Sequence, residues 1–297
     1  MALQNDIICW WSGGITSAVA CKVALDLYGI DRCLFIMIDT RNEDEDTYRF
    51  KKDCEAWYGK NIEVIDNFGE RYNNIQDVWR KYVSLNVAHG AVCSSELKRI
   101  AREKWQRENE YTHQVFGFEF DKKEFNRANG MKLNHAKSKP IFPLMMLGYD
   151  KEDCINLVRV EGIKPPRAYG WGFNNNNCLG TGCVQGGIGY WQKMAIDFPL
   201  KFDTMANMEH ELTDLKGHPV TMLKDQSNKA KKAQKVHKYA NLVFLKEHPE
   251  YPELKCLKDM KARVVLPLME CNGFCGVNEL DVKNDTVNEL NFEGAIL

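Results

Sequence analysis

The sequence has 297 residues, with 40 basic and 41 acidic side chains and a net charge of −1. Its 44% hydrophobic and 27% charged residues are ordinary values for a globular protein, so the composition excludes wholesale disorder. The near-neutral charge argues against a protein that coats nucleic acid, although it permits a local basic patch. No apolar run approaches the ~20 residues of a membrane-spanning helix and the first residues do not resemble a secretory leader, so we expect no membrane contact and a cytoplasmic location.

The first half of the chain alternates between short apolar runs and helical patterns. Strands are predicted at residues 6–11, 33–38, 62–65 and 114–118, and helices up to residue 29 and over residues 43–58, 95–109 and 150–162. Asp150 is a good N-cap for the last of these helices. Such alternation is typical of an α/β fold with a doubly wound, mostly parallel sheet.

The pattern changes after residue 165. Residues 168–189 are rich in Gly and Asn, and such a segment is expected to be ordered only if something holds it in place. Residues 201–239 look helical and polar. We therefore expect an α/β domain over residues 1–165, and a cysteine-containing, helical extension over residues 166–297 that packs on it.

A glycine-containing loop, Ser12-Gly13-Gly14-Ile15-Thr16-Ser17, separates the first predicted strand from the first predicted helix. Its two glycines let the backbone approach an anion closely, and the free N–H groups at a helix start attract negative charge. The three hydroxyl groups can donate further hydrogen bonds to phosphate oxygens. The loop is neither a Walker loop nor a dinucleotide fingerprint, and a plain strand-to-helix turn capped by serine is the alternative.

Five ordered elements resemble motifs of the PP-loop ATP pyrophosphatase superfamily, and more closely of its phosphoadenosine phosphosulfate (PAPS) reductase-like family. They are the glycine loop, Asp39-Thr40-Arg41-Asn42-Glu43, Cys93-Ser94-Ser95-Glu96-Leu97-Lys98, Gly117-Phe118-Glu119 with Glu124 and Arg127, and Pro143-Leu144 with the stretch from Gly148 to Asp153. The resemblance covers about residues 6–195. It implies that the domain over residues 1–165 binds an adenine nucleotide.

The resemblance also implies roles for single residues around the α-phosphate of ATP or an adenylyl sulfate. The residues implied to hold the nucleotide are Ser12, Gly13, Gly14, Thr16, Ser17, Asp39, Thr40, Glu119 and Arg127. Lys98 and Arg99 would balance the remaining negative charge as catalytic residues, and Cys93 is either a reactive thiol or a residue that packs or helps to hold a metal. If ATP is the substrate, we expect Mg²⁺ with Asp39 or Glu119 among its ligands.

Four of the eleven cysteines form two close pairs, Cys178 with Cys183 and Cys271 with Cys275. Four thiolates satisfy either tetrahedral zinc or an iron–sulfur cluster, and such a site would order the loop around the first pair. Zinc would make the site structural, whereas a cluster would allow redox or sulfur-carrying chemistry. Two unrelated pairs of packing thiols are the alternative.

The leading interpretation is ATP-dependent adenylation of an acceptor, coupled to sulfur transfer from a sulfur donor protein. The acceptor would be a nucleic acid held by the lysine-rich stretch from Lys224 to Lys238. A thiol-dependent sulfonucleotide reductase and a non-catalytic nucleotide-binding subunit are the alternatives. Residues 270–274 lack the His of the Glu-Cys-Gly-x-His tail expected of such reductases, so the sequence favours ATP. We also expect a homo-oligomer.

Overall fold

A computed structural model describes residues 4–87, 90–176 and 178–268 of the chain. At its centre lies a five-stranded sheet in the order β3-β2-β1-β6-β7, and every neighbouring pair of its strands is parallel. Its strands are β1 (Ile7–Trp10), β2 (Cys33–Ile38), β3 (Ile62–Ile65), β6 (His113–Val115) and β7 (Pro140–Ile141). The sheet confirms the predicted α/β class.

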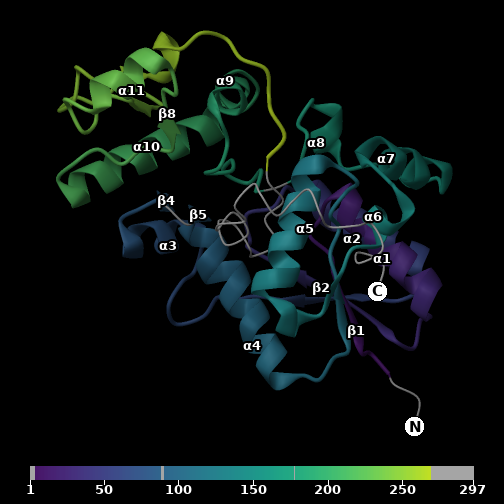
Figure 1. Cartoon of the computed structure of the whole chain (residues 1–297). Coiled ribbons are helices and arrows are strands. Elements are labelled where there is room, and N and C mark those ends of the chain that lie inside the picture. The colour runs from purple at the N-terminus through teal and green to yellow at the C-terminus, as the bar shows by residue number, and fades with distance from the viewer. Residues whose placement is uncertain (1–3, 88–89, 177, 269–297) are drawn as a thin grey trace.

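Side chains of the central strands alternate between two apolar layers, as the pleat requires. Ile7 and Cys9 pack with Phe35 in one buried cluster, whereas Ile8 and Trp10 belong to another on the opposite face. The first cluster includes residues of α1 (Ile15–Tyr28), α2 (Glu45–Tyr58) and α7 (Lys151–Val160); the second draws on α4 (Ile100–Glu108) and α5 (Lys122–Asn134). Helices therefore cover both faces of the sheet, which is the doubly wound arrangement (Figure 1).

Shorter elements connect this framework. They are α3 (Ile75–Tyr82), β4 (Asn86–Val87), β5 (Gly90–Ala91), the π-helix η1 (Ser94–Arg99), the 3₁₀-helix η2 (Ala136–Ser138), α6 (Pro143–Leu147) and α8 (Arg167–Gly170). Helix α3 and the β4–β5 hairpin were not predicted from the sequence. The predicted helix over residues 95–109 is present, but its first part is the π-helix.

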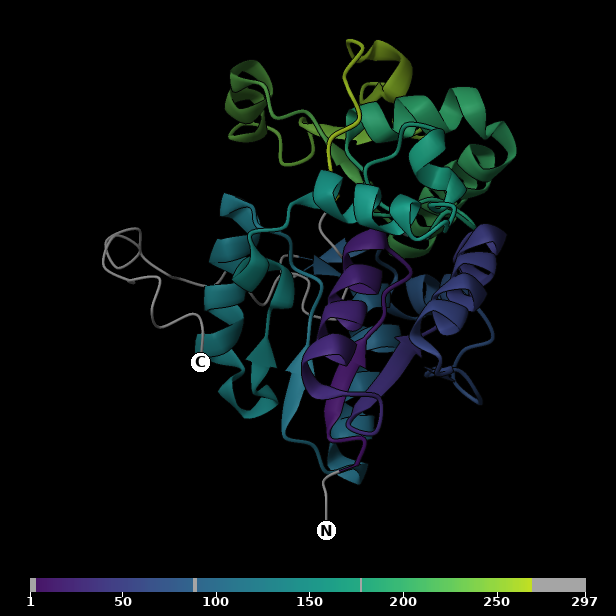
Figure 2. The same cartoon turned by 90° about the vertical axis from the view of Figure 1, so that its right-hand side faces the viewer.

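The C-terminal part forms a cap above one end of the parallel sheet (Figure 2). It contains α9 (Ile188–Asp197), α10 (Pro199–Lys216), β8 (Leu223–Lys224), α11 (Asn228–Gln234), β9 (Leu242–Phe244), β10 (Lys255–Cys256) and the 3₁₀-helix η3 (Leu257–Asp259). The three strands form a small sheet in the order β10-β9-β8. Glu209 of α10 is fully buried and accepts hydrogen bonds from the N–H groups of Met222 (2.8 Å) and Leu245 (2.7 Å), which ties the helix to this sheet.

The prediction of one helical stretch over residues 201–239 is wrong. Helix α10 is capped at its C-terminus by Gly217, which has φ +67°, and Pro219 follows two residues later. A left-handed glycine stops a helix and a nearby proline cannot continue it, so the chain turns into β8 before α11 begins. Among the described residues no helix has the length and apolar character needed to cross a membrane.

One apolar cluster joins the two parts of the chain. Trp79 and Leu97, from the part before residue 165, pack in the same buried cluster as Trp191 and Met205 from the part after it. The same cluster contains Cys178. The C-terminal part and the segment between β3 and β6 therefore share a core.

Candidate functional site

The glycine loop lies where the strand order of the sheet reverses. It leaves the C-terminal end of β1, which has β2 on one side and β6 on the other. In open α/β sheets this crevice is where ligands bind. Gly13 has φ +87°, a conformation that glycine adopts without strain, and Gly14 caps α1 without any side-chain hydrogen bond.

Hydrogen bonds within the loop fix its shape. Ser17 Oγ accepts from the Ser12 N–H (3.0 Å) and the Ser12 hydroxyl (2.9 Å), and it donates to the carbonyl oxygen of Gly14 (2.8 Å). The N–H of Ile15 donates to the Tyr169 hydroxyl at 3.1 Å. The N–H groups of Gly13 and Gly14 have no hydrogen-bond partner among the described residues. They are the donors that the loop offers to an anion at the helix N-terminus.

A cavity of about 330 Å³ opens beside the first turn of α1. Its lining includes Thr16, Gly117, Glu119, Asp121, Lys151 and Asn175. Gly117 is required here because a Cβ at this position would lie 2.5 Å from the Cα of Ser17. The volume falls at the lower end of the range for small-molecule sites.

Charges of both signs line this cavity. Lys151 Nζ lies 3.6 Å from Glu119 Oε1 and donates to the Asn174 carbonyl oxygen at 3.2 Å. Arg127 is buried away from the lining, where it donates to both carboxylate oxygens of Glu124 at 2.7 Å. Lys151 is therefore a cation of the cavity wall, whereas Arg127 compensates the charge of Glu124.

Asp39 and Thr40, predicted at the end of β2, each form a hydrogen bond with a nearby side chain. Both carboxylate oxygens of Asp39 accept from the Tyr48 hydroxyl at 3.0 Å. Burial, and secondarily the Asp39 charge, raises the pKa of Tyr48 above its usual value, so this hydroxyl stays a donor. The Thr40 hydroxyl donates to Glu43 Oε1 at 3.0 Å. Neither Asp39 nor Thr40 lines the cavity of about 330 Å³.

Glu43 connects two predicted motifs with the cysteine loop. Its side chain is 2% exposed, its Oε1 lies 3.7 Å from Lys98 Nζ, and its Oε2 accepts from the Cys178 N–H at 3.1 Å. The predicted catalytic Lys98 is thus buried beside a carboxylate. Arg99 points elsewhere and lies 4.0 Å from Glu103, with more than a third of its side chain exposed.

Asparagine side chains hold the cysteine loop against the glycine loop. Asn176 Nδ2 lies 2.9 Å from the Gly13 carbonyl oxygen and 2.9 Å from Thr47 Oγ1. The Gly180 N–H donates to the Asn42 carbonyl oxygen at 2.8 Å. These bonds order a Gly- and Asn-rich loop through its contacts with the parallel-sheet part.

The cysteines of this loop are buried. Cys178 and Cys183 share an apolar cluster with Cys93, and the Cys183 N–H donates to the Tyr190 hydroxyl at 3.0 Å. Cys271 and Cys275 lie outside the described residues. Within the part of the chain that the structure describes, no three or more His, Cys, Asp or Glu side chains are grouped to hold a metal ion. The four-cysteine metal site therefore stays a prediction.

Sequence reasoning missed several residues that shape the site. They are Tyr169, Asn175, Asn176 and Lys151. The run of asparagines from 174 to 177 was a visible signal, because such a run in an ordered loop has to hydrogen-bond to something. What it bonds to is set by a tertiary contact across 163 residues.

Replacing Asn176 by alanine is expected to weaken binding of pyrophosphate about fivefold. In a trans peptide the C=O and the N–H point in opposite directions. Asn176 holds the Gly13 carbonyl oxygen, so the Gly14 N–H of the same peptide points away from Asn176. Losing this hydrogen bond should cost about 1 kcal/mol of binding free energy, because the Gly14 N–H is no longer held in position. Isothermal titration with pyrophosphate measures the effect. The exposed Asn109→Ala serves as control, and equal affinities of the two variants would contradict this role.

No family model and no curated protein matches the chain. Among solved structures, the phosphate complex of phosphoadenylyl-sulfate (PAPS) reductase from Candida auris is similar, with a TM-score of 0.44 and 13% sequence identity. The match covers 58% of this chain and 81% of that one.

Proposed function

We propose that this protein is an enzyme that acts at the α-phosphate of an adenine nucleotide, with ATP-dependent adenylation as the first step of sulfur transfer. The observation that carries the proposal is the glycine loop at the strand-order reversal, with two backbone N–H groups that have no partner among the described residues. These donors and the positive end of the α1 dipole suit a chain of phosphates. The choice of adenine rests on the motif resemblance.

Each wall of the cavity has a role in this proposal. Thr16 and Lys151 line the cavity and would bind the phosphates there, and the amides of Gly13 and Gly14 add donors from the turn before α1. Glu119 and Asp121 line the same cavity, and carboxylate oxygens are ligands that Mg²⁺ prefers. When bound, Mg²⁺ would neutralise phosphate charge as pyrophosphate departs. Lys98 does not line this cavity and lies 3.7 Å from Glu43, which compensates its charge.

In the reaction, an acceptor oxygen forms a bond to the α-phosphorus of ATP. The bond between the α-phosphorus and the bridging oxygen breaks, and pyrophosphate leaves with the electron pair. A sulfur nucleophile, delivered by a donor protein, then attacks the activated carbon of the acceptor and AMP leaves. The loop amides act in the first step, because negative charge grows on the phosphate oxygens there.

The proposal predicts that Lys151→Gln weakens ATP binding about 10- to 100-fold, the usual cost of losing a charge-assisted contact. The exposed Lys164→Gln, with the same change of charge, should leave the affinity unchanged. Isothermal titration with Mg·ATP measures both, and GTP tests the preference for adenine. If the unaltered protein bound neither ATP nor an adenylyl sulfate, the proposal would be overturned. If the protein instead released sulfite from an adenylyl sulfate in the presence of thioredoxin, its activity would be that of a sulfonucleotide reductase.

A further inference from the structure

Positive charge is concentrated on one segment of the C-terminal part. Residues 224–238, called here the lysine segment, contain six lysines and one aspartate, a net charge of +5. Because the whole chain carries −1, all other residues together carry −6. A chain that is neutral overall is therefore strongly polarised, with its excess of cations around α11.

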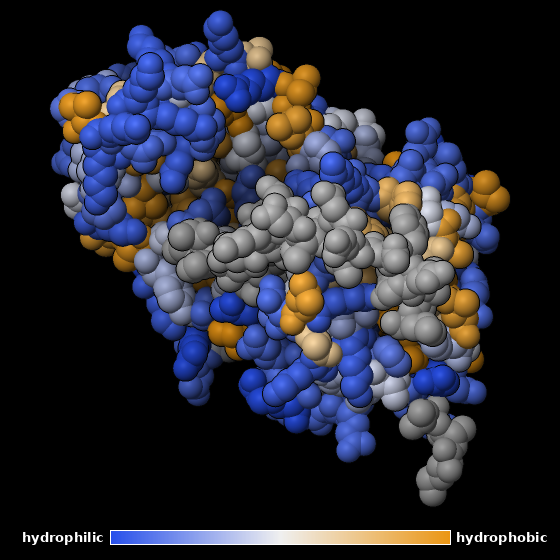
Figure 3. Space-filling view, in the orientation of Figure 1, coloured by the Kyte–Doolittle hydropathy of each residue, from blue (hydrophilic) through white to orange (hydrophobic). Residues whose placement is uncertain are grey.

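The positive charge of the lysine segment is not compensated locally. The six lysines are Lys224, Lys229, Lys231, Lys232, Lys235 and Lys238, and all are exposed. None of them forms an ion pair within the described residues, and Asp225 is instead paired with Lys255 at 2.6 Å. The hydrogen bond from Lys255 lowers the pKa of Asp225 to about 2. Figure 3 shows a continuous hydrophilic surface over α11 at the upper left.

Two adjacent cavities, together called here the groove, lie between Lys224 of the lysine segment and Thr16 of the glycine loop. A second cavity, of about 700 Å³, begins at Lys224 and Gln226 and extends to Lys123 and residues 266–268. Lys123 and residues 266–268 also line the cavity of about 330 Å³, so the two cavities are adjacent and share these residues as a common wall.

The charges along this groove change from one end to the other. The charged residues that line the outer cavity are Lys123, Lys224 and Arg263, without any carboxylate. The inner cavity is lined by three carboxylates, Glu119, Asp121 and Glu124, beside Lys123 and Lys151. The outer cavity and the lysine segment thus favour a polyanion, and the inner end suits a metal-bound nucleotide.

We propose that this groove is the track of a single-stranded nucleic acid, which is the acceptor of the adenylation. The inference rests on the proposed function for the reaction and on the groove for the class of acceptor. The lysine segment neutralises backbone phosphates, and an unpaired nucleotide extends into the inner cavity. A duplex cannot place a reacting atom there without flipping a nucleotide out of its stack.

Aromatic side chains accompany the cations, as in other single-strand sites. His218 and Tyr239 stack with ring centroids 5.6 Å apart at 17°, and Lys238 Nζ lies 5.1 Å from the Tyr239 ring. Stacking surfaces next to lysines favour a nucleic acid over an acidic protein, which offers no bases to stack.

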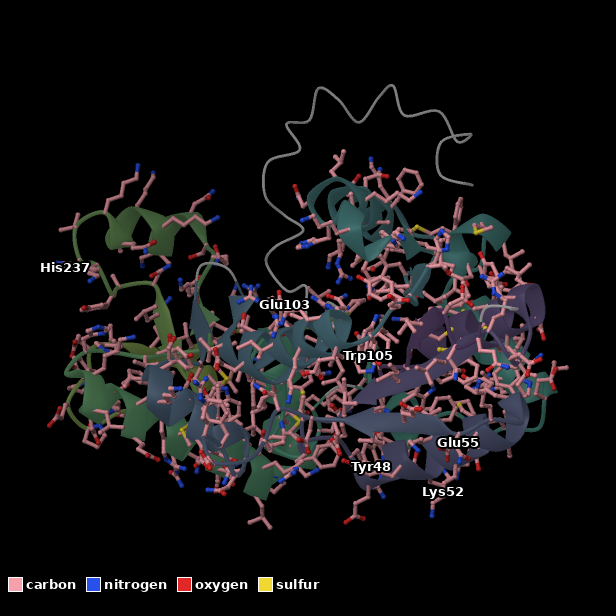
Figure 4. All side chains as sticks on the ribbon, turned by 90° about the horizontal axis from the view of Figure 1, so that it is seen from below. Tyr48, Lys52, Glu55, Glu103, Trp105 and His237 are labelled. Atoms are coloured by element: carbon pink, nitrogen blue, oxygen red, sulfur yellow. The ribbon has the colours of Figure 1, made fainter. Side chains whose placement is uncertain are left out.

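The test compares two triple variants with the same loss of charge. Lys231, Lys232 and Lys235 are replaced by Gln in one, and the exposed Lys52, Lys104 and Lys137 in the other. Figure 4 shows Lys52 and His237, which follows α11, at opposite ends of the molecule. Binding of the full chain to a labelled 20-nucleotide single strand, RNA in one arm and DNA in the other, is followed by fluorescence anisotropy at several salt concentrations.

The logarithm of the binding constant falls linearly with the logarithm of the salt concentration. Each lost phosphate contact reduces the magnitude of this slope by about 0.7. The first variant should therefore bind about 100-fold more weakly at ~0.1 M salt, with a slope about 2 smaller, whereas the second should bind like the unaltered protein. The double variant Lys123→Gln with Lys224→Gln removes two cations of the groove. It should bind the strand about 25-fold more weakly than the unaltered protein. Mg·ATP affinity should be the same in the two triple variants, since none of the lysines that they replace lines the inner cavity.

Three outcomes would overturn the inference: no binding of either strand, equal weakening of both triple variants, or unchanged binding when Lys123 and Lys224 are replaced. Displacement of the strand by poly-glutamate at equal charge would also overturn it and indicate an acidic protein partner. Binding of ATP without any strand would leave the proposed function intact. If the protein bound a strand but did not bind ATP, the proposed function would be contradicted and the groove would remain a nucleic-acid site.

Discussion

Gly117→Ala is expected to weaken nucleotide binding about 100-fold and to destabilise the protein. A Cβ on Gly117 would lie 2.5 Å from Ser17 Cα and 2.6 Å from Ser17 N, and these are backbone atoms that cannot rotate away. The first turn of α1 has to separate from the end of β6. Overpacking of this kind costs about 3 kcal/mol of unfolding free energy, and a displacement near 1 Å costs about 100-fold in binding.

Urea denaturation and titration with Mg·ATP measure the two effects separately. Gly170→Ala is the matched control, because no atom lies within 4 Å of the added Cβ. Its stability should be equal or slightly higher, since alanine restricts the unfolded chain. If Gly117→Ala bound ATP like the control, the close contact of β6 with the loop would have no part in binding.

The unfolding free energy should fall as pH rises from about 5 to 8, and Glu209→Gln should remove most of this dependence. Burial raises the pKa of Glu209 to about 8, despite the two N–H groups that its carboxyl accepts from. The folded protein therefore keeps this proton at pH values where the unfolded chain has released it. The stabilising contribution is complete below the ordinary glutamate pKa and is lost at about 1.4 kcal/mol per pH unit as pH rises toward 8.

Urea denaturation at pH 5, 6.5 and 8 provides the measurement. At pH 5 the NH₂ group of the introduced amide faces one of the two backbone N–H donors, so Glu209→Gln should be about 1 kcal/mol less stable than the unaltered protein. Toward pH 8 the difference should shrink or reverse. The exposed Glu110→Gln should keep the original pH profile. Parallel profiles for the protein and Glu209→Gln would show that Glu209 is ionised throughout.

The sequence was sufficient for the framework of the sheet. The apolar run at 33–38 coincides with β2, because a buried strand of a parallel sheet is continuous in hydrophobicity, and residues 62–65 form the edge strand β3. Asp150 caps α7 as predicted, and Asp153 completes a reciprocal capping box. These features are local, so a short stretch of residues determines them.

The arrangement of the site depended on contacts that no local pattern contains. The glycine loop and Glu119 could be identified from motifs, and Thr16 of the loop lines one cavity together with Glu119. The pairing of Glu43 with Lys98 and the bond from Asn176 to Gly13 join segments that are distant in sequence. Polar residues of this kind are predicted on solvated surfaces by default, and only the fold shows which of them are buried.

The core cluster that unites Trp79 and Leu97 with Trp191 and Met205 has a consequence for how such a chain can evolve. Side chains of both parts pack together in this cluster. Deleting or exchanging the C-terminal part would therefore expose apolar surface around Trp79 and Leu97, which favours aggregation. New specificity has to arise by altering the cap in place, through loops and surface charges, instead of by swapping modules. The sheet and its cap should be inherited together.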